Sequence, residues 1–122
     1  MEKTEELKDR LYRFALEVVR LVRSVPREVA GVEIGRQLIR SGTSVAANYE
    51  EAAPAFSKSD FIYKLSTSFK ESKETNLWIR LLRDSGLISS KTAEPLVKES
   101  YEIASILAKS LKTARKNLES GV

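Results

Sequence analysis

Four glutamates are the residues of this chain best suited to metal or acid–base chemistry. Glu50 and Glu51 are adjacent, and Glu71 and Glu74 are separated by about one helical turn. Clustered carboxylates can hold Mg²⁺, so two neighbouring helices carrying these pairs could build a magnesium site. The first hypothesis for these residues is therefore a hydrolase that uses magnesium.

Two features oppose this hypothesis. All-α nucleotide pyrophosphohydrolases need a further acid three residues beyond the paired glutamates, and this chain has Pro54 there. Lys70 and Lys73 stand beside the second pair, where they favour salt bridges within one helix. The alternative is that the glutamates neutralise an arginine inside a structural network. We therefore expect no metal site.

An asparagine marks the position of that network. Val45, Asn48 and Ala52 are three and four residues apart, so they share one face of a helix. An amide on a buried face needs its hydrogen bonds, because leaving it unpaired costs on the order of 1–3 kcal/mol. We predict a buried structural network with the members Arg40, Asn48, Glu51, Glu71 and Glu74.

Basic side chains form two further groups that could bind phosphate. If the first helix is regular, its arginines project within a sector of about 80°. Arginine binds phosphate through two parallel hydrogen bonds. The second group ends the last helix, where stabilisation of the helix dipole is the alternative interpretation. Neither group is interleaved with aromatic residues, which favours recognition of the nucleic-acid backbone. The predicted nucleic-acid-binding residues are Arg13, Arg20, Arg23, Arg27, Lys109, Lys112, Arg115 and Lys116.

Composition narrows the possible functions. The 122 residues include no cysteine and no histidine, which removes thiolate chemistry and the usual general base at neutral pH. We expect a non-enzymatic protein with no catalytic residues and no cofactor. The longest uncharged run, 41–49, falls far short of the ~18 residues that span a bilayer, and the acidic start is unlike a secretory signal. We therefore predict a cytoplasmic protein without membrane contact.

Hydrophobic periodicity predicts four helices, at about 4–24, 31–53, 59–84 and 90–119. In the first, apolar residues step by four and three from Leu7 to Val25, the pattern of a bundle seam. In the second, Gly42 would allow close approach of a neighbouring helix, and a loop around Gly42 is the alternative. The connections are short, so we predict one all-α domain over residues 1–122, an antiparallel up-down-up-down four-helix bundle.

Three blocks of the sequence resemble a known family. They are 40–52 (RSGTSVAANYEEA), 57–65 (SKSDFIYKL) and 70–82 (KESKETNLWIRLL). These blocks resemble the bacterial four-helix-bundle family of 23S rRNA intervening-sequence proteins, also called S23-like, which includes the accessory variability proteins of diversity-generating retroelements. Two positions depart from the common pattern: Ala52, where many members carry glycine, and Asn76, where an aromatic residue is frequent.

The resemblance implies a homopentameric barrel that binds nucleic acid. Members of the accessory branch bind a reverse transcriptase as well, and the ribosomal branch suggests an rRNA precursor as the ligand. We therefore expect a basic, oligomeric accessory protein that binds RNA or DNA through backbone contacts. The alternative is a protein-interaction module that docks an acidic partner without nucleic acid, because a net charge of +4 suits either kind of ligand.

Overall fold

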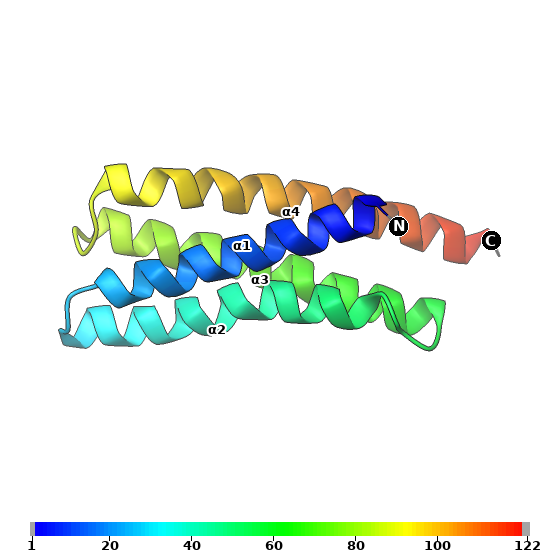
Figure 1. The fold of residues 1–122 in the computed structure, drawn as a ribbon, viewed down its shortest axis with the longest axis horizontal. Helices are drawn as coiled ribbons and strands as arrows, with labels where there is room; N and C mark the ends of the chain where they lie inside the picture. The colour runs from blue at the N-terminus through cyan, green and yellow to red at the C-terminus, as the bar shows by residue number, and fades with distance from the viewer. Residues whose placement is uncertain (1, 121–122) are drawn as a thin grey trace.

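Four long helices make up the computed structural model, which describes residues 2–120 and the side chains from Thr4 to Ser120. They are α1 (Glu2–Ser24), α2 (Val29–Ala52), α3 (Lys58–Asp84) and α4 (Ser90–Glu119). Consecutive helices run in opposite directions, which confirms the predicted all-α bundle (Figure 1). The observed bounds lie within two residues of the predicted ones. The alternative of a loop around Gly42 is wrong, because α2 runs through it.

The seam predicted for α1 is buried. Leu11, Phe14, Val18 and Leu21 are almost inaccessible to solvent. Against this seam, α2 presents Gly42, where an added Cβ would lie 2.7 Å from Cγ1 of Val18. Real Cβ atoms do not approach so closely, so glycine at this position permits the observed spacing of α1 and α2.

Serines are the N-cap residues of two of the helices. The Oγ atom of Ser57 accepts a hydrogen bond from the backbone N–H of Asp60 at 3.1 Å, and Ser89 caps α4 in the same way through Thr92. Each bond satisfies a backbone donor that the first turn of a helix leaves unpaired. Between α3 and α4, Gly86 has a φ of 81°, a left-handed conformation that favours glycine.

Hydroxyls and an amide share the interior with leucine and isoleucine. Thr75 donates to Oγ of Ser41 at 3.0 Å between α3 and α2, and Asn76 donates to Oγ of Ser100 at 2.8 Å between α3 and α4. Among the described residues, every buried side-chain nitrogen or oxygen has a hydrogen-bond partner. The polar groups therefore fix the register of α3 against its neighbours without an unpaired donor.

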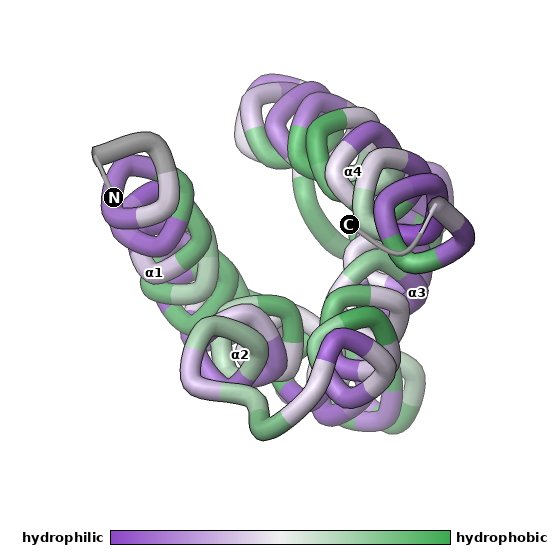
Figure 2. Tube along the Cα trace, turned by 90° about the vertical axis from the view of Figure 1, so that its right-hand side faces the viewer, coloured by the Kyte–Doolittle hydropathy of each residue, from purple (hydrophilic) through white to green (hydrophobic). Residues whose placement is uncertain are grey.

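The bundle is not equally closed on all sides. α3 packs closely against both α2 and α4, whereas α1 packs on α2 and barely approaches α4. Viewed along the bundle, the backbones of α1 and α4 stand apart (Figure 2), and side chains of both helices line a groove between them. An ion pair between Arg10 and Glu99 links α1 to α4 in this groove, with hydrogen bonds of 2.7 and 2.8 Å.

None of the helices in residues 2–120 has the length and apolar character needed to cross a membrane.

Candidate nucleic-acid interface

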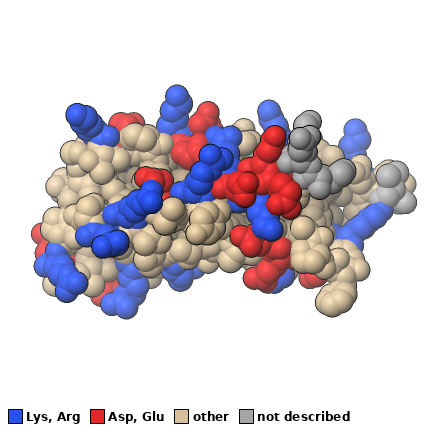
Figure 3. Space-filling model, viewed as in Figure 1, with Lys and Arg blue, Asp and Glu red and all other residues tan. Residues whose placement is uncertain are grey.

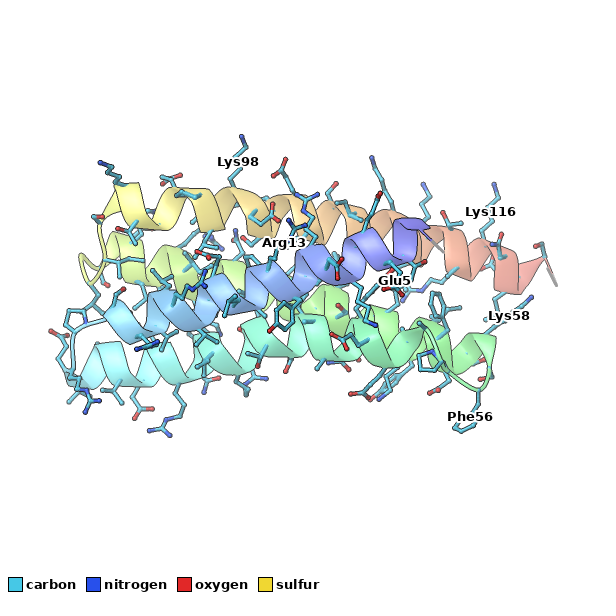
Figure 4. The ribbon with its side chains drawn as sticks, in the orientation of Figure 1. Glu5, Arg13, Phe56, Lys58, Lys98 and Lys116 are labelled. Carbon is cyan, nitrogen blue, oxygen red and sulfur yellow. The ribbon has the colours of Figure 1, made fainter. Side chains whose placement is uncertain are left out.

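The two predicted basic groups lie at opposite ends of the bundle. Arg23 lies in the last turn of α1 and Arg27 follows in the α1–α2 loop, whereas Lys112, Arg115 and Lys116 lie near the end of α4. Figure 1 shows the α1–α2 loop and the end of α4 at opposite ends of the molecule, and Figure 4 labels Lys116 there. The 24 residues of α2 run between the two levels and span about 36 Å. One chain therefore presents two separate basic surfaces.

The first basic surface is built around a groove. Three arginines line it, from the last turn of α1, the loop and the second turn of α2, and its remaining walls are mostly apolar. Figure 3 shows Lys and Arg side chains over this end of the molecule, with some Asp and Glu side chains among them. We call this site the arginine groove; it is lined by Arg23, Arg27, Arg36, Val22, Val25, Val32 and Ile39.

Arg36 is a member of this groove that the sequence did not single out. It lies on α2, four residues after Val32 and three before Ile39, so the three side chains share one helical face. The signal was available, because a short connection after Arg23 places the first turns of α2 beside the last turns of α1. The pattern of either helix alone does not reveal this contact.

The groove arginines differ from most others in the chain. Arg10, Arg20, Arg40 and Arg83 each form an ion pair with a carboxylate. Within residues 4–120, the side chains of the three groove arginines make neither a hydrogen bond nor an ion pair with another described residue. Because these arginines form no ion pair with another described residue, their charge is available for an anionic ligand.

The other two predicted α1 arginines are already engaged. Arg20 forms an ion pair with Glu17 at 2.6 Å, and Arg13 donates to the backbone oxygen of Asp9 at 3.4 Å. Both side chains remain exposed. An exposed ion pair contributes little energy, so Arg20 can exchange Glu17 for a ligand.

The second basic surface lies on α4 alone. Lys109, Lys112, Arg115 and Lys116 are exposed, and none of them pairs with a carboxylate among the described residues. Lys116 lies in the last turn of α4, where a cation also interacts favourably with the helix dipole. We call this surface the lysine end; its cations all come from one helix, whereas those of the arginine groove come from two helices and a loop.

Only part of the predicted buried network forms as one unit. Arg40 contacts Glu74 and lies 3.1 Å from Glu71, and Trp78 donates to Glu74 at 3.1 Å. Burial raises the pKa of Glu71. Burial opposes ionisation of Glu74 too, but hydrogen bonds from Trp78 and Arg40 outweigh it and lower that pKa. Because half of the Arg40 side chain is exposed, the cluster lies at the surface, and its predicted burial is wrong.

Glu51 and Asn48 do not join that cluster, which corrects the prediction of one network. Glu51 pairs with Lys64 at 2.7 Å across the α2–α3 connection. The half-buried Asn48 donates to the backbone oxygen of Ser44 at 2.9 Å, so its own helix satisfies it. The deeply buried amide belongs instead to Asn76, which is 5% exposed. Asn76 lies four residues after Ser72 and three before Ile79, both buried on α3, so this spacing could have predicted its burial.

The glutamate pairs considered for magnesium do not come together. Glu51 binds Lys64, whereas Glu71 and Glu74 bind Arg40. Among the described residues, no group of three or more acids, histidines or cysteines is placed to hold a metal ion.

Comparison with known proteins identifies the family of this chain. The family model described as "23S rRNA-intervening sequence protein" matches residues 3–109. A solved structure of a protein of unknown function from the S23 ribosomal protein family of Bacteroides thetaiotaomicron is similar over 87% of this chain and 98% of its own. The identity is 36% and the TM-score 0.81. No curated protein matches the chain.

Proposed function

Because the chain belongs to the 23S rRNA-intervening sequence protein family, we propose that it is a non-enzymatic accessory protein that binds RNA or DNA in the cytoplasm. The proposal rests on one observation: three arginines line the same groove, and none of them pairs with another side chain that the structure describes. Backbone phosphates are the ligand that such arginines fit, because guanidinium groups bind phosphate oxygens in pairs.

The lysine end provides a second phosphate-binding surface. Its four cations follow one exposed side of α4, so they can track a nucleic-acid backbone without reading bases. A single nucleic acid that reaches both ends of one chain must extend over about 36 Å, the length of α2.

The protein acts as a homopentamer in this proposal. Five copies with a net charge of +4 carry about +20, a field that attracts nucleic acid from solution. An apolar strip between α1 and α2, with Tyr12 59% exposed beside Leu16 and Ala47, offers a surface for contact between subunits.

The partner is a reverse transcriptase if the chain belongs to the retroelement branch, and an rRNA precursor if it belongs to the ribosomal branch. The similarity to a structure from the S23 ribosomal protein family supports membership of the family and does not select a branch. The genes beside this one distinguish the branches: template and variable repeats next to a reverse transcriptase, or an rRNA operon.

The test is the salt dependence of binding. A labelled RNA and a labelled DNA of equal length are titrated with the protein between 50 and 300 mM salt. We expect the logarithm of the association constant to fall linearly with the logarithm of salt concentration, because neutralised phosphates release counterions. A slope near zero, or no binding at the lowest salt, would contradict the proposal. A monomeric mass by light scattering would remove the pentamer alone.

A second candidate is the docking of an acidic protein. A groove between α3 and α4 favours it, because Lys73 and Arg80 line it beside the exposed Tyr101. Neither cation pairs with a described carboxylate. Asn76 accepts a hydrogen bond from Nε of Arg80 at 2.7 Å, which holds the guanidinium in place. A protein complex that forms without any affinity for RNA or DNA would select this function.

A further inference from the structure

We propose that the arginine groove holds an unpaired nucleotide, with its base against the apolar wall and its phosphates on the arginines. The inference rests on the proposed binding of nucleic acid and adds which form of nucleic acid binds at this site. It follows from three features: the shape of the groove, the chemistry of its walls and the origin of its arginines.

The shape of the site suits a single strand. The phosphate backbone of a duplex is a convex surface, and a flat or protruding row of cations would match it. Here the cations surround a recess between two helices. An unstacked base is a flat group that can enter such a recess, whereas a paired base stays inside the duplex.

The walls supply the contact for a base. Val22, Val32 and Ile39 add nothing to phosphate binding, yet they line the same recess as the arginines. Val32 leaves 44% of its surface exposed, so this wall is accessible from solvent. An apolar surface beside cations fits a ligand with one apolar face and one anionic edge, and a nucleotide has both.

The arginines approach from three segments that are well fixed. Backbone hydrogen bonds hold the loop: the Glu28 N–H donates to the Pro26 oxygen at 3.0 Å, and the Val32 N–H donates to the Glu28 oxygen at 2.8 Å. At the base of the groove, an added Cβ on Gly31 would lie 2.4 Å from the Pro26 oxygen. The backbone segments that carry the arginines are therefore fixed before any ligand arrives, and a guanidinium plane can also lie flat on a base.

The groove contains no aromatic side chain, so it is not a stacking platform. It therefore discriminates weakly among the four bases. The discrimination we expect is between a nucleotide that exposes its base and one that does not.

The experiment measures the affinity of the full chain for four labelled probes at one salt concentration. The probes are a 12-nucleotide single-stranded RNA, the 12-base-pair duplex, an abasic 12-mer with the same phosphates, and poly-L-glutamate. We expect the single strand to bind on the order of tenfold tighter than the duplex or the abasic strand, because only it can bury a base. Val32→Ser should remove most of that preference and leave the affinity for the abasic strand unchanged.

Two matched variants serve as controls. Val29→Ser alters a more exposed valine outside the groove lining, and Lys98→Gln removes an exposed cation on α4, whereas Arg36→Gln removes one from the groove. Only Val32→Ser should reduce the preference for the single strand, whereas Arg36→Gln should weaken the single strand and the abasic strand alike, and by more than Lys98→Gln does. Circular dichroism confirms that each variant is folded.

The outcomes separate the two proposals. Equal affinity for single strand, duplex and abasic strand would overturn the unpaired-nucleotide site and leave the proposed function standing. Tight binding of poly-L-glutamate without binding of any nucleic acid would overturn both and favour an acidic protein partner.

Discussion

The two basic ends of the bundle carry similar charge but are built differently. At the arginine end, cations from α1, the loop and α2 converge on a groove with apolar walls. At the lysine end, the cations follow one side of a single exposed helix. Net charge cannot distinguish these ends, since both attract phosphate. The difference between them is convergence, because a ligand in the recess can contact cations from three segments at once, whereas the cations of the lysine end come from one helix.

Removing three cations from either end gives the largest expected contrast. The two triple variants change the net charge equally, but we expect the groove variant to lower RNA affinity on the order of 30–100-fold and the helix variant about tenfold or less. Fluorescence anisotropy with a short single-stranded RNA measures both. The variants are Arg23→Gln with Arg27→Gln and Arg36→Gln, against Lys112→Gln with Arg115→Gln and Lys116→Gln.

Equal losses from the two variants would show that only total charge matters. That result would remove the distinction between the ends while leaving nucleic-acid binding in place. The slope of affinity against salt should fall for both variants, because each loses phosphate contacts.

The scaffold of the arginine end can be broken by a single methyl group. In Gly31→Ala the new Cβ would lie 2.4 Å from the Pro26 oxygen, so the loop must shift, and we expect a loss of about 1–3 kcal/mol in the free energy of unfolding. In Gly35→Ala the new Cβ would lie 3.4 Å from Cγ1 of Val22, a contact that side chain can accommodate. This matched variant should be neutral, or stabilising by up to about 1 kcal/mol.

Thermal or urea denaturation followed by circular dichroism checks this pair. If both variants unfold alike, the close approach at Gly31 does not constrain the loop. A destabilised Gly31→Ala that still binds RNA normally would show that the loop geometry is not needed by the ligand.

A smaller effect is expected from the acids near the arginine end. Arg83 is neutralised there by Asp84 at 2.8 Å and by Glu94 at 2.9 Å. Glu94→Gln should free part of this positive charge and tighten RNA binding about twofold at low salt. Glu119→Gln makes the same change at the end of α4. A larger gain from Glu119→Gln would place the stronger binding surface at the lysine end.

The smallest effect concerns pH. Hydrogen bonding to Arg83 lowers the pKa of Asp84 in the folded chain. The Asp84–Arg83 ion pair therefore stabilises the fold at pH values above the pKa of the carboxyl in the unfolded chain. This contribution disappears as the pH falls through the lower pKa that Asp84 has in the folded chain. Because the pair is exposed, the loss is small. Asp84→Asn should lose this part of the acid sensitivity, measured as the midpoint of thermal unfolding between pH 7 and pH 3.

The fold could be predicted from the sequence because local signals agreed with one another. The seam of α1, the serine caps and Pro26 and Pro54 each mark a helix or its end, and short connections require antiparallel neighbours. The surface was harder to predict. Helical spacing on α1 accounts for Arg23 but not for Arg27, which lies in the loop after α1, and Arg36 joins them only through contact between α1 and α2. The Asn48 prediction failed because its own helix supplies the acceptor that we assigned to a network.

The weak contact between α1 and α4 has a consequence for how the chain opens. α1 rests chiefly on α2, and the Arg10–Glu99 pair crosses to α4, whereas α3 is enclosed by two neighbours. We expect the amide protons of α1 to exchange with deuterium before those of α3, because local unfolding begins where the fewest packed groups must separate. The last turn of α1 carries Arg23, so detachment of α1 would dismantle the arginine groove while α2, α3 and α4 stay folded together.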